Sequence, residues 1–117
     1  MNIYLEQVRA NVSNLQKSIQ WYEETLGLKV TGYWPHENPN YAHFEFDKGA
    51  TFSIMEHDEF PSRGRFNFKV ENVDAFWEEI KDKVEVEVVE ELFNTPYGSR
   101  KFTIKDLDGN ELGFGQE

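Results

Sequence analysis

The sequence contains no cysteine, which excludes disulfide bonds, thiolate catalysis and cysteine-bound zinc. It also lacks any apolar run near the roughly 18 residues that a membrane-spanning helix needs. The start, MNIYLEQV, has no basic segment followed by an apolar run, so it does not resemble a signal peptide. We therefore expect a cytoplasmic protein that does not associate with a membrane.

Positive charge is scarce as well. Twelve Lys and Arg residues face 22 Asp and Glu residues, which gives a net charge of −10. Nucleic-acid binding depends on clustered Lys and Arg that displace counterions, so we do not expect it here. The acidic excess is consistent with simple solubility. Much of it lies in one segment of the second half: Glu78, Glu79, Asp82, Glu85, Glu87, Glu90 and Glu91.

The composition is sufficient for a packed core. At 117 residues the chain, residues 1–117, has the length of a single domain. Aromatic residues make up 15% of it, including ten Phe, and each of them buries a large area.

Two segments have helical periodicity. In residues 13–27, Ser13 is a predicted cap, Gln16 would complete a capping box, and Gly27 suits a left-handed helix end. In residues 72–84, Asn72 is the predicted cap. The apolar stripes are Leu15, Ile19, Tyr22 and Leu26 in the first segment, and Val73, Phe76, Trp77, Ile80 and Val84 in the second.

The segments around each helix alternate between apolar and polar residues, as half-buried strands do. Gly49 and Gly109 are typical of tight hairpin turns, and Val88-Val89 indicates a bulge. The pattern repeats after about 60 residues, and residues 57–64 read as the linker. The predicted strands are 7–12, 28–34, 41–47 and 50–54 in the first copy, and 65–70, 85–93, 101–106 and 110–114 in the second.

We therefore predict an α+β fold of two tandem βαβββ modules, at about residues 1–57 and 65–117. The helix of each module covers one face of its sheet, so the other face must meet something else. We expect the two curved mixed sheets to form a cup-shaped cleft with these polar faces. The predicted core face carries Val8, Ala10, Val12, Phe44, Phe46, Phe52, Ile54, Phe66, Phe68, Val70, Phe102, Ile104, Leu112 and Phe114.

The opposite face is polar, and its basic residues Arg9, Arg65, Lys69 and Lys105 meet the acidic Glu45 and Glu111. This balance favours a neutral or anionic small ligand over a polycation. Water alone is the alternative occupant of such a face. The other polar-face residues are Gln7, Asn11, His43, Thr51, Ser53, Met55, Asn67, Thr103 and Gly113.

Two runs carry a resemblance to a known family. VSNLQKSIQWYEETLGL, which begins at Val12, and FTIKDLDGNEL, which begins at Phe102, are similar to the vicinal-oxygen-chelate superfamily. Its members include glyoxalase I, bleomycin-resistance proteins, fosfomycin-resistance enzymes and extradiol dioxygenases. The likeness covers nearly the whole chain, and both runs are signatures of fold rather than of one activity.

The resemblance implies where a metal would bind. In metal-dependent relatives four strands each supply one ligand, and those positions hold Gln7, Ser53, Arg65 and Gly113 here. Gln is compatible with a ligand. Ser is a poor one, Gly has no side chain, and Arg cannot donate a lone pair. We therefore expect no divalent metal cofactor.

Two other patterns in the sequence suggest metal sites. His43 and Glu45 lie on one strand face and, with Gln7 or Glu111, form a possible ligand set, although a hydrogen-bonded surface pair is the commoner arrangement. The segment DLDGN at 106–110 suggests a calcium loop, but its Gly is in the wrong position, so a hairpin turn is expected.

The resemblance and the missing ligands together predict a metal-free small-molecule-binding protein of the resistance or sequestration type, acting as a homodimer. An alternative is a glyoxalase-like lyase or isomerase, or a dioxygenase, with a non-standard metal site or with Glu45 or Glu111 as general base. In a third hypothesis the polar face is buried only against a second chain. Loop aromatics Trp34, Phe60 and Tyr97 are candidate contacts. The predicted ligand-binding residues are Gln7, Arg9, His43, Glu45, Ser53, Met55, Arg65, Asn67 and Glu111.

Overall fold

The computed structural model describes residues 1–57, 59 and 62–117. The chain forms two compact units, Met1–Ser62 and Arg63–Glu117, and their boundary falls inside the predicted linker. Phe60 and Pro61 lie outside the described residues. Each unit is described by itself below.

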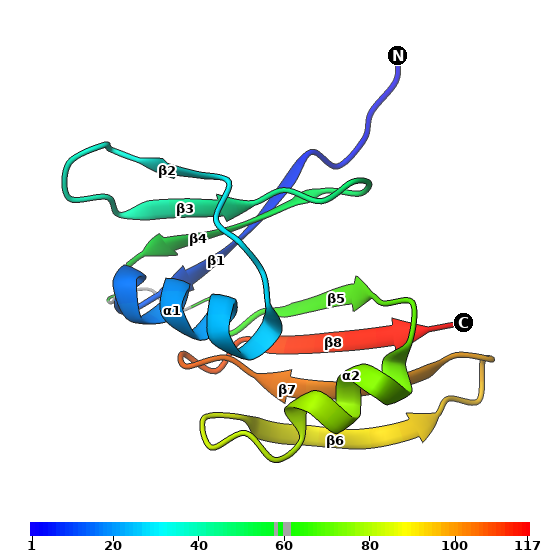
Figure 1. The fold of residues 1–117 in the computed structure, drawn as a ribbon. Coiled ribbons are helices and arrows are strands. Elements are labelled where there is room, and N and C mark those ends of the chain that lie inside the picture. The colour runs from blue at the N-terminus through cyan, green and yellow to red at the C-terminus, as the bar shows by residue number, and fades with distance from the viewer. Residues whose placement is uncertain (58, 60–61) are drawn as a thin grey trace. The chain divides into compact units, whose positions relative to one another are not determined.

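The first unit has one helix and one four-stranded sheet (Figure 1). The strand order is β1-β4-β3-β2, in which β1 and β4 are parallel and the other pairs are antiparallel. The elements are β1 (Gln7–Val12), α1 (Leu15–Leu26), β2 (Gly32–Trp34), β3 (Tyr41–Phe44) and β4 (Thr51–Glu56).

The second unit repeats this arrangement. Its sheet order is β5-β8-β7-β6, again with one parallel pair, β5 and β8. The predicted α+β fold of two βαβββ modules is thereby confirmed, with two curved, open sheets. The elements are β5 (Arg65–Lys69), α2 (Val73–Ile80), β6 (Glu87–Asn94), β7 (Arg100–Lys105) and β8 (Glu111–Gln116).

Each helix packs on one face of its own sheet through aromatic side chains (Figure 1). In the first unit the Tyr22 ring lies 5.6 Å from the rings of both Phe44 and Phe52. In the second, the Phe76 ring lies 5.9 Å from Phe102 and 5.1 Å from Phe114. Aromatic pairs at these distances combine large buried area with favourable ring geometry. They leave the opposite face of each sheet free of the helix.

Both helices begin in the same way. The Asn72 side chain accepts a hydrogen bond from the Ala75 amide, as the predicted cap should. In α1 the cap is Asn14, which accepts from Lys17, so the prediction of Ser13 was wrong. Asn14 is the cap because the helix already begins at Leu15. The amide of Leu15 donates a hydrogen bond to the Glu56 carboxylate at 2.8 Å.

Two apolar assignments need correction. Val84 is fully exposed, because α2 ends at Ile80 and does not reach it. After Ile80 the chain forms turns, in which the Lys83 amide donates to the Ile80 carbonyl and the Val86 amide to the Lys83 carbonyl. Phe46 is 38% exposed. Phe46 lies beyond the end of β3 at Phe44, where the Glu45 amide donates a hydrogen bond to the Thr31 hydroxyl.

The second strand of each predicted module also differs in extent. Strand β2 is shorter than the predicted 28–34, because the amides of Gly27 and Leu28 donate back to the helix and end it. Strand β6 starts at Glu87 rather than Glu85 because a turn precedes it. The predicted bulge at Val88-Val89 is confirmed, since the register shifts between Val88 and Glu90.

The predicted turn glycines are confirmed. Gly27, Gly49 and Gly109 have φ angles of 73°, 87° and 85°, in the region that other residues rarely adopt. The segment from Asp106 to Asn110 is a hairpin turn closed by the Asp106 carboxylate, which accepts from the Asp108 and Asn110 amides. The calcium-loop alternative is thus not the arrangement seen.

The cap assignment is testable. Replacing Asn14 with Ala removes the acceptor for the Lys17 amide, so we expect the free energy of unfolding in urea to fall by about 1 kcal/mol. Gln16→Ala is the matched control, because Gln16 is exposed and would matter only if a Ser13–Gln16 capping box existed. Equal losses in the two variants would contradict the Asn14 cap.

Candidate functional site

The strand registers confirm the predicted polar faces. Residues directly opposite each other share a face. Gln7 is opposite Thr51, and Ser53 is opposite both Arg9 and His43. In the second unit Glu111 is opposite Arg65 and Lys105, while Gly113 is opposite Asn67 and Thr103. The predicted site residues therefore gather on the helix-free face of their own sheets, and the cup between the two faces stays a prediction.

On the first polar face three side chains are joined by hydrogen bonds, and Glu45 lies near the end of this series. The Gln7 amide donates to the Tyr41 hydroxyl. That hydroxyl lies 3.0 Å from His43 Nδ1, and His43 Nε2 lies 3.8 Å from the Glu45 carboxylate. Tyr41 was missed in the list of site residues, although it precedes His43 by two positions and therefore shares its face.

The His43 ring also depends on a glycine in the next strand. A Cβ atom added at Gly32 would lie 2.5 Å from His43 Nε2. The ring therefore occupies the space that any other side chain at position 32 would need.

The remaining predicted residues of this face are Arg9, Met55 and Ser53. The Arg9 guanidinium donates to the Met55 sulfur at 3.2 Å. Ser53 is fully buried, and its hydroxyl donates to the Val8 carbonyl at 2.9 Å. Ser53 is thus a structural link between β4 and β1 and does not present its hydroxyl to a ligand.

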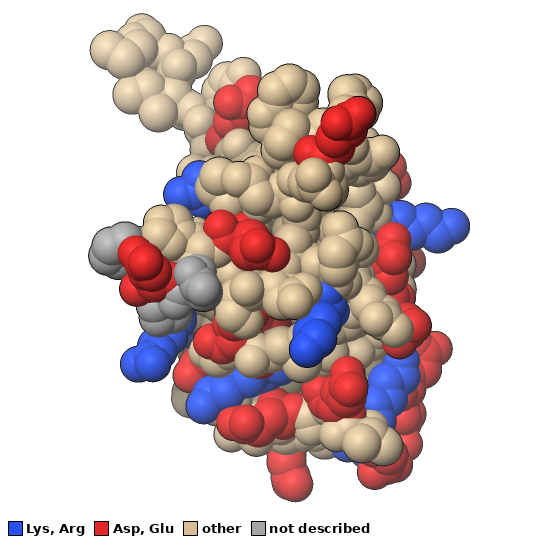
Figure 2. All heavy atoms as spheres, turned by 90° about the vertical axis from the view of Figure 1, so that its left-hand side faces the viewer, with Lys and Arg blue, Asp and Glu red and all other residues tan. Residues whose placement is uncertain are grey.

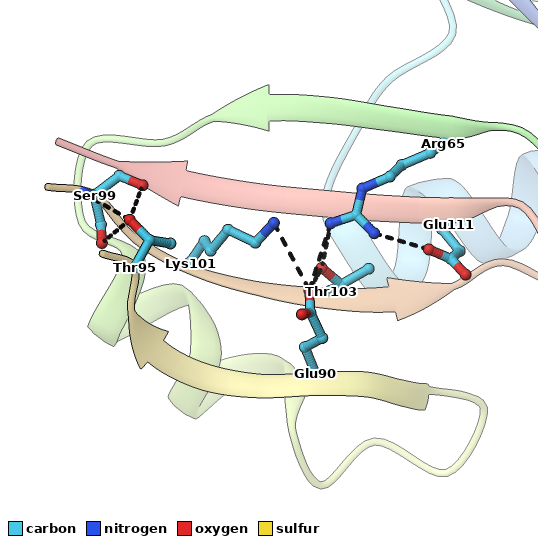
Figure 3. Close-up of polar contacts among 7 residues, drawn as sticks. All are labelled: Arg65, Glu90, Thr95, Ser99, Lys101, Thr103 and Glu111. Carbon is cyan, nitrogen blue, oxygen red and sulfur yellow. Dashed lines mark hydrogen bonds and ion pairs between the residues drawn. The ribbon is translucent and has the colours of Figure 1, made fainter. Parts of the chain in front are cut away.

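The second polar face carries a network that spans all four strands (Figure 3). Arg65 donates to the Glu111 carboxylate at 2.9 Å, to the Thr103 hydroxyl at 3.3 Å and to the Glu90 carboxylate at 3.4 Å. Figure 3 shows the guanidinium between Glu111 on one side and Glu90 on the other. Of this network the sequence predicted Arg65 and Glu111 as ligand-binding residues.

Glu90 lies where three of these groups meet. It accepts a hydrogen bond from Thr103 at 2.8 Å, and Lys101 Nζ lies 3.7 Å away. The Thr103 hydrogen bond lowers the pKa of Glu90 below its ordinary value of 4.5; burial opposes this, while Arg65 and Lys101 add to it. Glu90 and Lys101 were missed. Glu90 follows the bulge, which breaks the alternation that identifies faces, whereas simple alternation back from Thr103 would have found Lys101.

The positions that would hold a family-type metal do not fit one. Arg65 is a cation already engaged with two carboxylates. Gly113 supplies no ligand atom, and the Asn67 side-chain oxygen lies where its Cβ atom would be, at 2.5 Å. With Ser53 committed to Val8, only Gln7 retains a suitable oxygen.

The second metal hypothesis, built on His43 and Glu45, gains no further ligand. Among residues 1–57, 59 and 62–117, no group of three His, Asp or Glu side chains could hold a metal ion. Of the two proposed third members, Glu111 accepts a hydrogen bond from Arg65 at 2.9 Å, and Gln7 donates its amide nitrogen to Tyr41. His43 and Glu45 are therefore an ordinary surface pair in this arrangement.

A hollow of about 420 Å³ opens on the second unit. It includes Asn67, a predicted ligand-binding residue, and several groups that the sequence did not single out as such. It is lined by Arg65, Asn67, Phe68, Lys69, Tyr97, Ser99, Lys101, Gly113, Gly115, Gln116 and Glu117.

The family model for the Glyoxalase/Bleomycin resistance protein/Dioxygenase superfamily matches residues 4–114. The chain belongs to this superfamily. The resemblance found in the two sequence runs is thereby confirmed across nearly the full length. No protein of curated function matches the chain.

Solved structures of superfamily type share the fold. TioX from Micromonospora sp. ML1 is 16% identical, with a TM-score of 0.83, and the match covers 97% of this chain and 98% of TioX. TnmS3, an antibiotic binding protein from Streptomyces sp. CB03234, is 21% identical, with a TM-score of 0.80 and coverage of 98% and 96%. A glyoxalase/bleomycin resistance protein from Catenulispora acidiphila is 28% identical, with a TM-score of 0.76 and coverage of 97% and 99%.

Two surface features bear on partners of this superfamily member. On the face shown in Figure 2, basic side chains are interspersed among acidic ones, and no continuous basic surface is visible over the described residues there. In the described part of the chain, neither helix is long and apolar enough to cross a membrane.

The state of Glu90 is testable by pH. Its ionised form is favoured in the folded chain, so its contribution to stability is present above pH 4.5 and is lost as the pH falls through the lowered folded pKa. We expect Glu90→Gln to reduce the free energy of unfolding at pH 7, and this deficit to shrink as the pH falls below 4.5.

The control for this measurement is Glu91→Gln, because Glu91 is exposed and has no hydrogen bond or ion pair with any residue that the structure describes. Urea unfolding of the three proteins at a series of pH values gives the comparison. A Glu90→Gln deficit that stays constant down to pH 3 would show that the lost contacts do not depend on the carboxylate charge.

Proposed function

We propose that this chain is a metal-free, small-molecule-binding member of its superfamily, of the resistance or sequestration type. The observation that carries the proposal is the state of Arg65. Its guanidinium stands at a metal-ligand position of metal-dependent relatives and is engaged with Glu111 and Glu90. A divalent ion placed beside it would be repelled.

The likeness to TnmS3 supports the binding part of the proposal, since that protein is described as antibiotic binding and shares the fold at a TM-score of 0.80. The polar faces support it as well. The helix-free face of the second unit carries hydrogen-bonding groups beside a hollow of about 420 Å³, and this volume is in the range of small-ligand sites.

The weak catalytic candidates gain little from the structure. Glu111 already has a partner, since its carboxylate lies 2.9 Å from the Arg65 guanidinium. Glu45 is largely exposed, and its carboxylate lies 3.8 Å from His43 Nε2. The lyase, isomerase or dioxygenase alternative stays a prediction without a supporting contact.

A thermal-shift experiment tests metal-free binding. We expect some members of a panel of aromatic antibiotics and metabolites to raise Tm by several degrees, because a ligand that binds only the folded state stabilises it. The shifts should be equal after dialysis against EDTA and after addition of zinc or nickel. Shifts that need the metal, or a panel without any shift, would contradict the proposal.

The proposal includes a homodimer, in which exposed loop aromatics such as Trp34, 65% exposed, supply contacts between chains. Sedimentation equilibrium should report twice the 13.8 kDa chain mass. Trp34→Ser should lower the dimer fraction, while Val84→Ser, at an equally apolar exposed position, should not. A monomer at all concentrations would refute this part.

A further inference from the structure

The hollow of the second unit is lined by two glycines of β8, Gly113 and Gly115. The space beside Gly113 is filled by the Asn67 side chain. The space beside Gly115 is open: a Cβ atom there would meet Lys101 Cβ at 3.7 Å and the Arg100 carbonyl at 3.8 Å, which are ordinary contacts. Gly115 is also absent from the glycines of positive φ. Neither backbone conformation nor packing therefore requires a glycine at 115, and its effect is to leave room.

The charges around that room differ from those of the chain as a whole. Three cations line the hollow, Arg65, Lys69 and Lys101, against the single carboxylate side chain of Glu117. The chain as a whole carries −10. Exposed charges more than about 8 Å away are largely screened at physiological ionic strength, so the local cations dominate what a bound ligand senses.

The two lysines are only weakly engaged. Lys101 Nζ lies 3.7 Å from Glu90, longer than a strong charged hydrogen bond of about 2.7–2.9 Å, and its side chain is 17% exposed. Lys69 pairs with Glu117 at 3.1 Å, but both side chains are at least 70% exposed, and such surface pairs contribute little. Either ammonium can exchange its present partner for an acid group of a ligand at small cost.

Neutral groups complete the lining. The Asn67 amide, beside Gly113, has no hydrogen bond with any residue that the structure describes. Tyr97, 74% exposed, lies at the rim in the turn between β6 and β7. Thr95 and Ser99 hold that turn through hydrogen bonds of 3.0 Å, so the ring has a fixed base (Figure 3).

We infer that this hollow binds small aromatic acids, with the acid group between Lys69 and Lys101 and the ring over Gly115 beside Tyr97. This inference rests on the proposed function and specifies its ligand class and place. A cationic ligand is disfavoured, because the nearby carboxylates of Glu90 and Glu111 already share Arg65. A neutral ligand would make the ring contacts but would not form charge-assisted hydrogen bonds with the ammonium groups of Lys69 and Lys101.

A matched pair of probes tests the charge requirement. 2-Naphthoate and 2-naphthamide have the same ring, and only the first is an anion. We expect naphthoate to bind at least about tenfold more tightly than the amide, the gain of about one charge-assisted hydrogen bond. Titrations followed by amide NMR shifts measure both affinities, and the largest shifts should include the amides of Gly113 and Gly115.

Three variants locate the site. Lys101→Met should weaken naphthoate binding about tenfold while leaving naphthamide nearly unchanged. Gly115→Leu should remove binding of both probes by filling the hollow. Lys105→Met is the control, because Lys105 lies on the same strand and face, pairs with Glu87 and does not line the hollow. Retained amide dispersion in the NMR spectrum confirms that each variant folds.

The outcomes separate this inference from the proposed function. Equal affinity for the two probes, or a Lys105→Met effect as large as that of Lys101→Met, would overturn the anion site. Shifts confined to the first unit would overturn its location. If neither probe binds while the antibiotic panel still raises Tm, the inference fails and the proposed function stands. If the panel also gives no shift, both fail.

Discussion

In each unit a helix covers one face of a four-stranded sheet, and aromatic rings fill the contact. Tyr22 does so in the first unit, and Phe76 does so in the second. This burial uses the apolar residues of β3 and β4 in the first unit and of β7 and β8 in the second, and leaves their other residues on the opposite face. The polar faces, their networks and the hollow all follow from it, because a strand that places one residue under the helix must place the next one away from it.

The two units keep the same scaffold and differ in what the free face carries. Both helices receive a side chain from the end of the last strand: Glu56 accepts from the first helical amide in one unit, and Gln116 does so in the other. The polar faces have no such correspondence. The first carries the interacting side chains of Gln7, Tyr41, His43 and Glu45, and the second carries the Arg65 network. The repeat therefore preserves helix docking while the faces have diverged.

Local rules predicted the elements well and failed where a neighbour intervened. Alternation and turn glycines placed most of the strands and the hairpins, since these depend on residues adjacent in the chain. Phe46 was placed in the core because alternation was extended beyond the last ladder pair of β3. Val84 was placed on a helix stripe that ends at Ile80. Ser13 was predicted as the cap because Gln16 would complete a capping box, whereas the helix is capped by Asn14 and its Leu15 amide donates to Glu56 from a distant strand.

The candidate site divides in the same way. Nearly all of its members could be assigned to a face from the sequence, including Arg65 at a position where relatives have a metal ligand. Their partners could not be assigned, because a long side chain reaches across two strands and its contacts depend on register. Glu90 was counted within an acidic segment, yet a bulge brings it to Thr103 and Arg65.

The sequence by itself determined the repeat, the two faces of each sheet and the loss of the metal-ligand residues, because these depend on residue type and spacing. The tertiary structure alone decided which carboxylates hold Arg65, that Asn67 fills the space of Gly113, and that Gly115 leaves a hollow beside Lys101. The physical reason is that contacts across strands depend on register, bulges and side-chain length, which no single segment contains.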